Sequence, residues 1–201
     1  MVRTRLALLG PALLAACGST PAPSPESDDR AAVAIAVRTS YPADAQWGRP
    51  KIIYFVRLEA EGDPSFAPEV FKSNHYTDGL AYLVNVPPGY YAAVASTEHR
   101  DGRERTTYFP VAMIKESLTK VDAGQVVLLG SFEVQQGKIG TTADAAQKHF
   151  RPLVEPDRTK QNVISKIFAQ NRYFIGREYR ATDDRTRREE QARSHLAESG
   201  W

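Results

Sequence analysis

The order of apolar and polar residues divides the chain into four parts. Residues 6–16 carry no charge and are mostly apolar, whereas residues 18–30 are mainly Pro, Ser, Gly and charged residues. Residues 31–139 contain short stretches in which apolar and polar positions alternate, and residues 140–201 show helical spacing followed by a charged end. Alternation with a period of two indicates strands, and apolar residues three or four apart indicate helices.

Seven stretches of the third part predict short strands. They cover residues 33–37, 51–58, 66–72, 80–86, 90–96, 106–114 and 125–134, and sequences such as Asp78-Gly79 and Asp101-Gly102 separate them with turns. The stretch 51–58 is apolar on both faces and is expected in the middle of a sheet. Pro68 and Pro110 favour edge strands or bulges, because proline cannot donate a backbone hydrogen bond. We therefore predict an antiparallel, seven-stranded β-sandwich over residues 31–139.

The last part predicts a helical, charged extension over residues 140–201. Residues 141–149 and 160–171 have the composition of helices, and the second carries one apolar stripe that is expected to pack on the domain. Residues 173–179 are aromatic and fit a last strand or a packed extension. Residues 180–201 mix Arg and Glu, which favours a solvated helix or a tail.

One turn links the predicted domain to a known fold. Val86, Pro87, Pro88, Gly89, Tyr90 and Tyr91 join two alternating strands, and this stretch resembles the strand-turn-strand of prealbumin-like sandwich domains, including carboxypeptidase regulatory-like modules. The resemblance implies a fold and no activity. An immunoglobulin-like sandwich is the alternative, although the chain lacks the cysteine pair of its disulfide-bonded form.

The amino terminus has the layout of an export signal. Arg3 and Arg5 precede the apolar run, which would span roughly 16 Å as a helix and is far shorter than the roughly 30 Å hydrocarbon core of a bilayer. Leu14-Ala15-Ala16-Cys17 then resembles the lipobox of bacterial lipoproteins. The resemblance implies a signal peptide over residues 1–16 and a diacylglyceryl group on Cys17. The alternative is an ordinary signal peptide in which Cys17 has no role.

The same resemblance predicts where the protein resides. Two or three acyl chains on Cys17 would hold it on a membrane effectively permanently. Gly18 favours the outer membrane over the inner one, with the domain facing the periplasm. Residues 17–30 would then be the lipidated cysteine and a flexible tether, because their composition cannot form a core.

Charge and cysteine content narrow the function classes. The formal net charge of the 201 residues is +2, and Arg3 and Arg5 account for it, so the exported part would be close to neutral. A neutral protein is a poor general binder of nucleic acid, which requires a basic surface. Cys17 is the single cysteine, which excludes an intramolecular disulfide.

No motif predicts a reaction. The four histidines, His75, His99, His149 and His195, lack the spacing of zinc ligands, and the motifs of serine hydrolases and nucleotide-binding loops are missing. Glu59, Glu61 and Asp63 could hold calcium weakly, but a solvated turn explains them better. An acylated Cys17 cannot be a nucleophile. We therefore predict no catalytic residue, metal or cofactor.

These observations favour a non-catalytic lipoprotein of the cell envelope, whose sandwich contacts another protein or an envelope component. A lipoprotein that binds a small ligand or carbohydrate is the first alternative, because aromatic faces can stack on sugars. A hydrolase with an unrecognised site is the second. The aromatic candidates are Tyr41, Trp47, Tyr54, Tyr76, Tyr90, Tyr91 and Tyr108.

Overall fold

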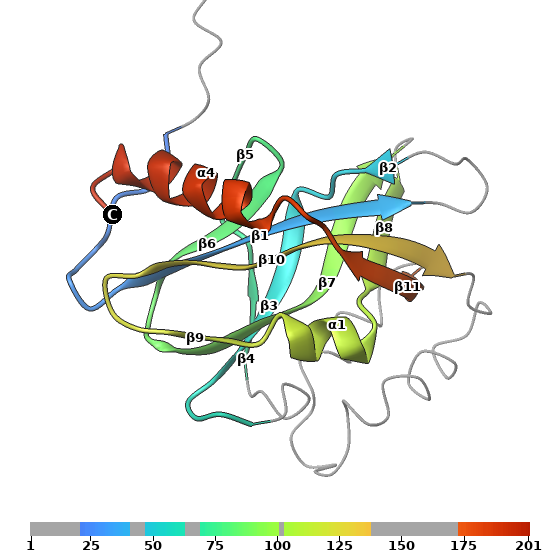
Figure 1. The fold of residues 1–201 in the computed structure, drawn as a ribbon, viewed down its shortest axis with the longest axis horizontal. Helices are drawn as coiled ribbons and strands as arrows, with labels where there is room; N and C mark the ends of the chain where they lie inside the picture. Colours follow the sequence, from blue (N-terminus) through green and yellow to red (C-terminus); the bar gives the residue numbers. More distant parts are fainter. Residues whose placement is uncertain (1–20, 41–46, 63–68, 101–102, 138–172) are drawn as a thin grey trace, which may run out of the picture.

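The computed structural model describes residues 21–40, 47–62, 69–100, 103–137 and 173–201 (Figure 1). These residues form eleven strands and two helices. The strands are β1 (Ala31–Ser40), β2 (Trp47–Gly48), β3 (Ile52–Leu58), β4 (Glu69–Lys72), β5 (His75–Thr77), β6 (Leu80–Val86), β7 (Gly89–Arg100), β8 (Arg103–Tyr108), β9 (Thr119–Val121), β10 (Val126–Gly137) and β11 (Tyr173–Ala181). The helices are α1 (Val111–Glu116) and α4 (Arg185–Ala197).

The strands are hydrogen-bonded in the order β4-β3-β7-β8-β11-β10-β1-β6-β5, with β2 beside β1 and β9 beside β7. This path folds into two layers, because buried residues of β3 and β7 pack against those of β1, β6 and β10. β4 and β5 lie at opposite ends of the path, yet they are joined by Ser73 and Asn74 alone. The backbone amide of Ser73 donates to Ile53 of one layer and that of Asn74 to Tyr82 of the other. This short segment therefore crosses between the layers.

A mainly β protein with two sheet layers is confirmed, but the arrangement is not seven antiparallel strands. β1 pairs with β10 in parallel, and β11 pairs with β8 in parallel. Short turns connect only antiparallel neighbours, whereas these two pairs join strands that are far apart in the sequence. Local turn signals could not indicate them.

β11 belongs to the same sheet as residues 31–137. It lies between β8 and β10, so the strand interpretation of residues 173–179 is confirmed, and this part of the chain is not a separate helical extension. The helices expected over residues 141–149 and 160–171 lie outside the described residues.

The strand expected over residues 106–114 is wrong in its second half. β8 ends at Tyr108, and α1 begins after Pro110. Pro110 has a φ of −56°, and its carbonyl accepts the amide of Ile114. The fixed φ of proline suits the start of a helix, and proline cannot extend a strand ladder. Met113 and Ile114 are then buried in the core.

β1 alternates between two sizes of apolar residue rather than between apolar and polar ones. Val33, Ile35 and Val37 face the core between the layers. The alanines at 32, 34 and 36 face a second, smaller core under α4. Small side chains let a helix approach a sheet closely, and Leu196 of α4 is fully buried there. The pattern of β1 thus accounts for both layers that cover it.

Two bulges change which face the following residues occupy. Asn85 has a φ of 63°, and the pairing of β1 with β6 shifts beside it, so Val84 lies under α4 while Val86 faces the main core. At Gly130 the pairing of β1 with β10 shifts in the same way. Phe132 therefore faces the core, and its neighbours at 131 and 133 face outward on the side of α4.

Residues 24–26, expected to be part of a tether, lie against the domain. The amide of Glu26 donates to the side chain of Asn85, whose own amide donates to the carbonyl of Ser24. The indole of Trp201 donates to the carbonyl of Pro23 over 2.8 Å. The two ends of the described chain therefore meet beside the end of α4.

Candidate functional site

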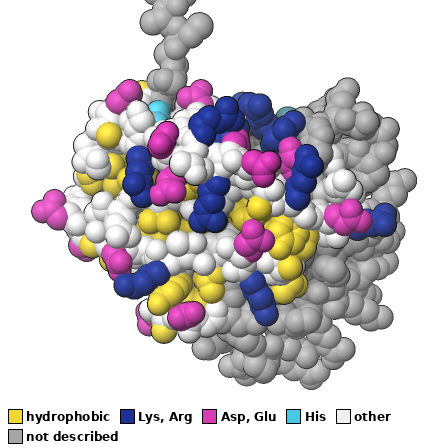
Figure 2. All heavy atoms as spheres, viewed as in Figure 1, with side chains coloured by type: hydrophobic (Ala, Val, Ile, Leu, Met, Phe, Trp, Pro, Cys, Tyr) yellow, Lys and Arg dark blue, Asp and Glu magenta, His cyan; other side chains and the backbone are white. Residues whose placement is uncertain are grey.

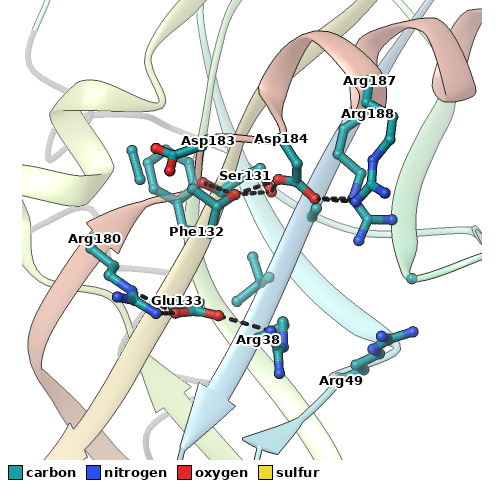
Figure 3. A pocket seen from close by; sticks show the side chains of 15 residues that line it. Arg38, Arg49, Ser131, Phe132, Glu133, Arg180, Asp183, Asp184, Arg187 and Arg188 are labelled. Carbon is teal, nitrogen blue, oxygen red and sulfur yellow. Dashed lines mark hydrogen bonds and ion pairs between the residues drawn. The ribbon is translucent and has the colours of Figure 1, made fainter.

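A pocket of about 640 Å³ opens beside the start of α4. Its walls come from β1, β10, β11, the turn that leads into α4, and the first residues of that helix (Figure 3). Side chains of both charges are mixed over this face of the molecule (Figure 2). The charged residues that line the pocket are Arg38, Arg49, Arg180, Arg187, Arg188, Glu133, Asp183 and Asp184.

Glu133 lies at the centre of a row of charges across three strands. It pairs with Arg38 of β1 on one side and with Arg180 of β11 on the other. Arg38 Nη1 lies 2.9 Å from Glu133 Oε1, and Arg180 Nε lies 2.6 Å from Oε2. The side chain of Glu133 is 6% exposed, whereas those of Arg38 and Arg180 are 43% and 74% exposed. The Gly130 bulge places this carboxylate in the pocket rather than in the core.

Asp184 forms a second cluster, immediately before α4. Ser131 and Thr182 donate their hydroxyls to Oδ1 over 2.8 and 2.5 Å. Arg187 and Arg188 donate to Oδ2 over 3.0 and 2.9 Å. Burial raises the pKa of Asp184, but these four hydrogen bonds outweigh it and hold the pKa well below its usual range. The aspartate therefore stays charged and ties the helix to β10.

Arg49 differs from the other arginines of the pocket, because it forms no hydrogen bond or ion pair with any residue that the structure describes. Its Nη1 atom lies 3.5 Å from the point where a Cβ on Gly79 would be, and Arg188 Nη1 lies 3.8 Å from the same point. Two guanidinium groups therefore flank Gly79. Arg188 Nη1 donates to the Asp78 carbonyl and to Gln191, and none of the described carboxylates forms an ion pair with Arg49.

This arrangement can hold a negative group. Guanidinium groups donate in planar pairs that match carboxylate and phosphate oxygens. The two inner carboxylates are already held by arginines, whereas Arg49 forms no ion pair with a described residue and keeps its donors to offer. Asp184 and Glu133 also position these arginines in advance, which reduces the ordering cost when a ligand binds.

The residues singled out in the sequence lie mostly outside this pocket. Cys17, His149, Asp63 and Tyr41 are not among the described residues. Tyr54, Tyr91 and Tyr108 are buried in the core, and Tyr76 packs against it. No tyrosine lines this pocket, and its aromatic lining residue is Phe132.

Two of the histidines are brought together, although their separation in the sequence gave no indication of it. His75 Nε2 and His195 Nε2 are 2.8 Å apart, whereas His99 is exposed on β7. Among the described residues, no group of three or more His, Cys, Asp or Glu side chains could hold a metal ion. Within the same residues, no helix has both the length and the apolar content required to cross a bilayer.

The pocket itself was missed because its members are scattered. Arg38, Glu133 and Arg180 are separated by 95 and 47 positions. The only local signal was an aspartate followed at three and four positions by arginine, which is the spacing of Asp184, Arg187 and Arg188.

Comparison with known proteins adds no relative. No family model, curated protein or solved structure matches this chain.

Proposed function

We propose that this chain is an exported, lipid-anchored binding protein, which holds an anionic group of a cell-envelope partner in its arginine-lined pocket. The position of Arg49 and Arg188 on either side of Gly79 is the observation that carries the proposal. Two positive charges that flank one residue repel each other, and an anion bound between them would offset that repulsion. A carboxylate or phosphate at Gly79 would receive hydrogen bonds from both.

The binding role fits the state of the other polar groups. The hydroxyl of Ser131 already donates to Asp184, and Thr182 donates to the same oxygen. These two hydroxyls are therefore already used within the protein, and the groups left to meet a ligand are the arginine side chains. The prealbumin-like or immunoglobulin-like character of the sandwich is likewise a proposal, supported by the turn at residues 86–91.

Anion binding is tested by calorimetric titration of the purified protein with sulfate and with citrate at low ionic strength. Arg49→Gln is expected to weaken binding by about 10-fold to 100-fold, since hydrogen bonds to charged groups contribute about 1.5–3 kcal/mol. Arg193→Gln is the control for the loss of one arginine charge, because Arg193 lies on α4, is 65% exposed, pairs with Glu189 and does not line the pocket. Equal losses in both variants, or no binding by the unmodified protein, would refute the proposal.

The anchor is tested separately, in cells supplied with labelled palmitate. The unmodified protein is expected to incorporate label and Cys17→Ser to incorporate none, with both amounts compared by immunoblot. Equal labelling of the two would contradict lipidation at Cys17. Gly18→Asp should then move the labelled protein from the outer to the inner membrane fraction, in a host with enterobacteria-like sorting.

A further inference from the structure

The contact between β5 and the end of α4 is a hydrogen bond between two imidazoles. His75 Nε2 and His195 Nε2 are 2.8 Å apart, and the rings are inclined by only 7°. The ring centroids are 5.1 Å apart, which exceeds the nitrogen separation by about two ring radii. The two Nε2 atoms therefore point at each other in nearly one plane. This is the geometry of an N–H···N bond, in which one nitrogen donates and the other accepts.

Such a bond holds one proton between the two nitrogens. A doubly protonated histidine has donors at both ring nitrogens and no acceptor. If both rings are protonated, two N–H groups and two positive charges face each other across 2.8 Å. The contact then turns from attractive to repulsive, so its strength depends on pH in the range where histidine titrates.

The surroundings offer little to compensate a second charge. Tyr82 of β6 is fully buried, and its ring is tilted against His75 and His195 at centroid distances of 5.5 and 5.6 Å. Asp78 and Arg188 are the charged residues that act on the Tyr82 hydroxyl, and Asp78 is exposed. Burial, and then the charge of His195, lower the pKa of His75. No described carboxylate accepts a hydrogen bond from either imidazole.

Besides the imidazole contact, this end of α4 is held by the buried Leu196 and by Trp201, which donates to Pro23. Ala192 and Leu196 are the buried residues of α4, and its other residues apart from Ala197 are polar. At its start the same helix supplies Arg187 and Arg188 to the pocket. A change in how α4 lies on β5 and β6 would therefore move the donors that face Gly79.

We propose that the His75–His195 pair is an acid-sensitive latch, which holds α4 on the sheet near neutral pH and releases its end when both imidazoles are protonated. The effect on anion affinity rests on the proposed function of the pocket, whereas the release of the helix does not. The sign of the pH dependence follows from linkage between protonation and folding. A histidine whose pKa is lower in the folded state than in the unfolded state favours the folded state at full strength above about pH 6.5. That contribution is lost as the pH falls through the lowered pKa of His75.

Trp201 reports on the latch, because it follows α4 and donates to Pro23. Trp47→Phe leaves Trp201 as the single tryptophan. In this background, the emission of Trp201 is expected to shift to longer wavelength as the pH falls from 7.5 to 5.0. His195→Gln should flatten the transition, since glutamine can still donate to His75 and does not titrate. His99→Gln is the control and should leave the transition unchanged.

The outcomes separate the latch from the pocket. A transition that persists in both His195→Gln and His75→Gln, or one that is missing from the Trp47→Phe parent, would overturn the latch. Sulfate, whose charge is constant in this range, should bind at least threefold more weakly at pH 5.0 than at 7.5, and His195→Gln should reduce that difference. If sulfate binds at neither pH but the Trp201 transition follows the histidines, the proposed function fails and the latch stands.

Discussion

Glu133 and its two arginines allow a prediction about which of two variants loses more stability, the one without the carboxylate or the one without both arginines. Glu133→Gln removes the central charge of the row but keeps its shape. The two arginine side chains, 43% and 74% exposed, can then turn to water, so no buried charge is left without a partner. The loss is limited to charge-assisted hydrogen bonds made by exposed donors. We expect the free energy of unfolding to fall by about 1–2 kcal/mol.

Removing both arginines, in contrast, leaves a buried charge without a partner. Arg38→Met with Arg180→Met leaves a carboxylate that is 6% exposed and has lost both guanidinium partners. Breaking a buried pair by deleting its counter-ion costs about 3–5 kcal/mol, because the remaining charge is not solvated. The double variant should therefore be less stable than Glu133→Gln, although it changes only exposed residues.

Urea unfolding at pH 7 measures both values, and an unchanged m-value shows that the two-state transition is preserved. Arg38→Met alone is the control for other contacts of Arg38. If Glu133→Gln is as destabilising as the double variant, the cost lies in the shape or packing of Glu133, and the reasoning from burial is wrong. In the sulfate titration, Glu133→Gln should tighten binding, because it removes a negative charge from the pocket.

Three further changes test how α4 and the chain start are held. Leu196→Ala should lower the free energy of unfolding by about 2–5 kcal/mol in urea, because this fully buried side chain fills the core under α4. Asn85→Ala should increase proteolytic cleavage near Ser24, since the side chain of Asn85 donates to that segment. Asn85→Gly should increase cleavage equally but lower the free energy of unfolding less, because glycine tolerates the φ of 63°. Asp184→Asn should be less stable than the unmodified protein at pH 7, and the difference should shrink below about pH 4 as the lowered pKa of Asp184 is approached, as acid titrations of thermal unfolding would show.

The strands could be predicted wherever their residues carry the information locally. Alternation or an apolar run indicated β1, β3, β6, β7 and β10, and the turn at Asp101-Gly102 indicated the hairpin that the pairing of Arg100 with Arg103 confirms. The edge position expected for residues 66–72 agrees with β4, the part of that stretch that the structure describes. These features depend on neighbours within a few residues, which a single sequence displays.

Pairing over long distances could not be predicted in the same way. β11 has the aromatic composition of a strand, but nothing in residues 173–181 specifies that β8 and β10 are its partners. Likewise, the residues of α1 include valine, methionine and isoleucine, which fit a strand as well as a helix. There, the packing of Met113 and Ile114 into the core decides the outcome.

The candidate site shows the same limit more sharply. The sequence places Arg187 and Arg188 in a solvated, mixed-sign helix or tail, and the structure shows the helix, α4. Their role depends on Asp184, which is tied to Ser131 across 53 positions. The face of Ser131 in turn depends on the bulge at Gly130, which a glycine in a strand can indicate but not place.

α4 connects the three proposals physically. Its start contributes arginines to the pocket, and its last turn carries His195. Trp201, four positions after the end of the helix, donates a hydrogen bond to Pro23. Pro23 is six positions after Cys17, a distance of at most about 20 Å when the chain is extended. In a lipid-anchored protein the end of α4 would thus be held close to the bilayer, and the pocket would lie about 20 Å away along the thirteen residues of the helix. Release of the histidine latch would then loosen α4 between its membrane-anchored end and its ligand-binding end. A fall in pH would thereby weaken ligand binding, although the two histidines do not touch the ligand.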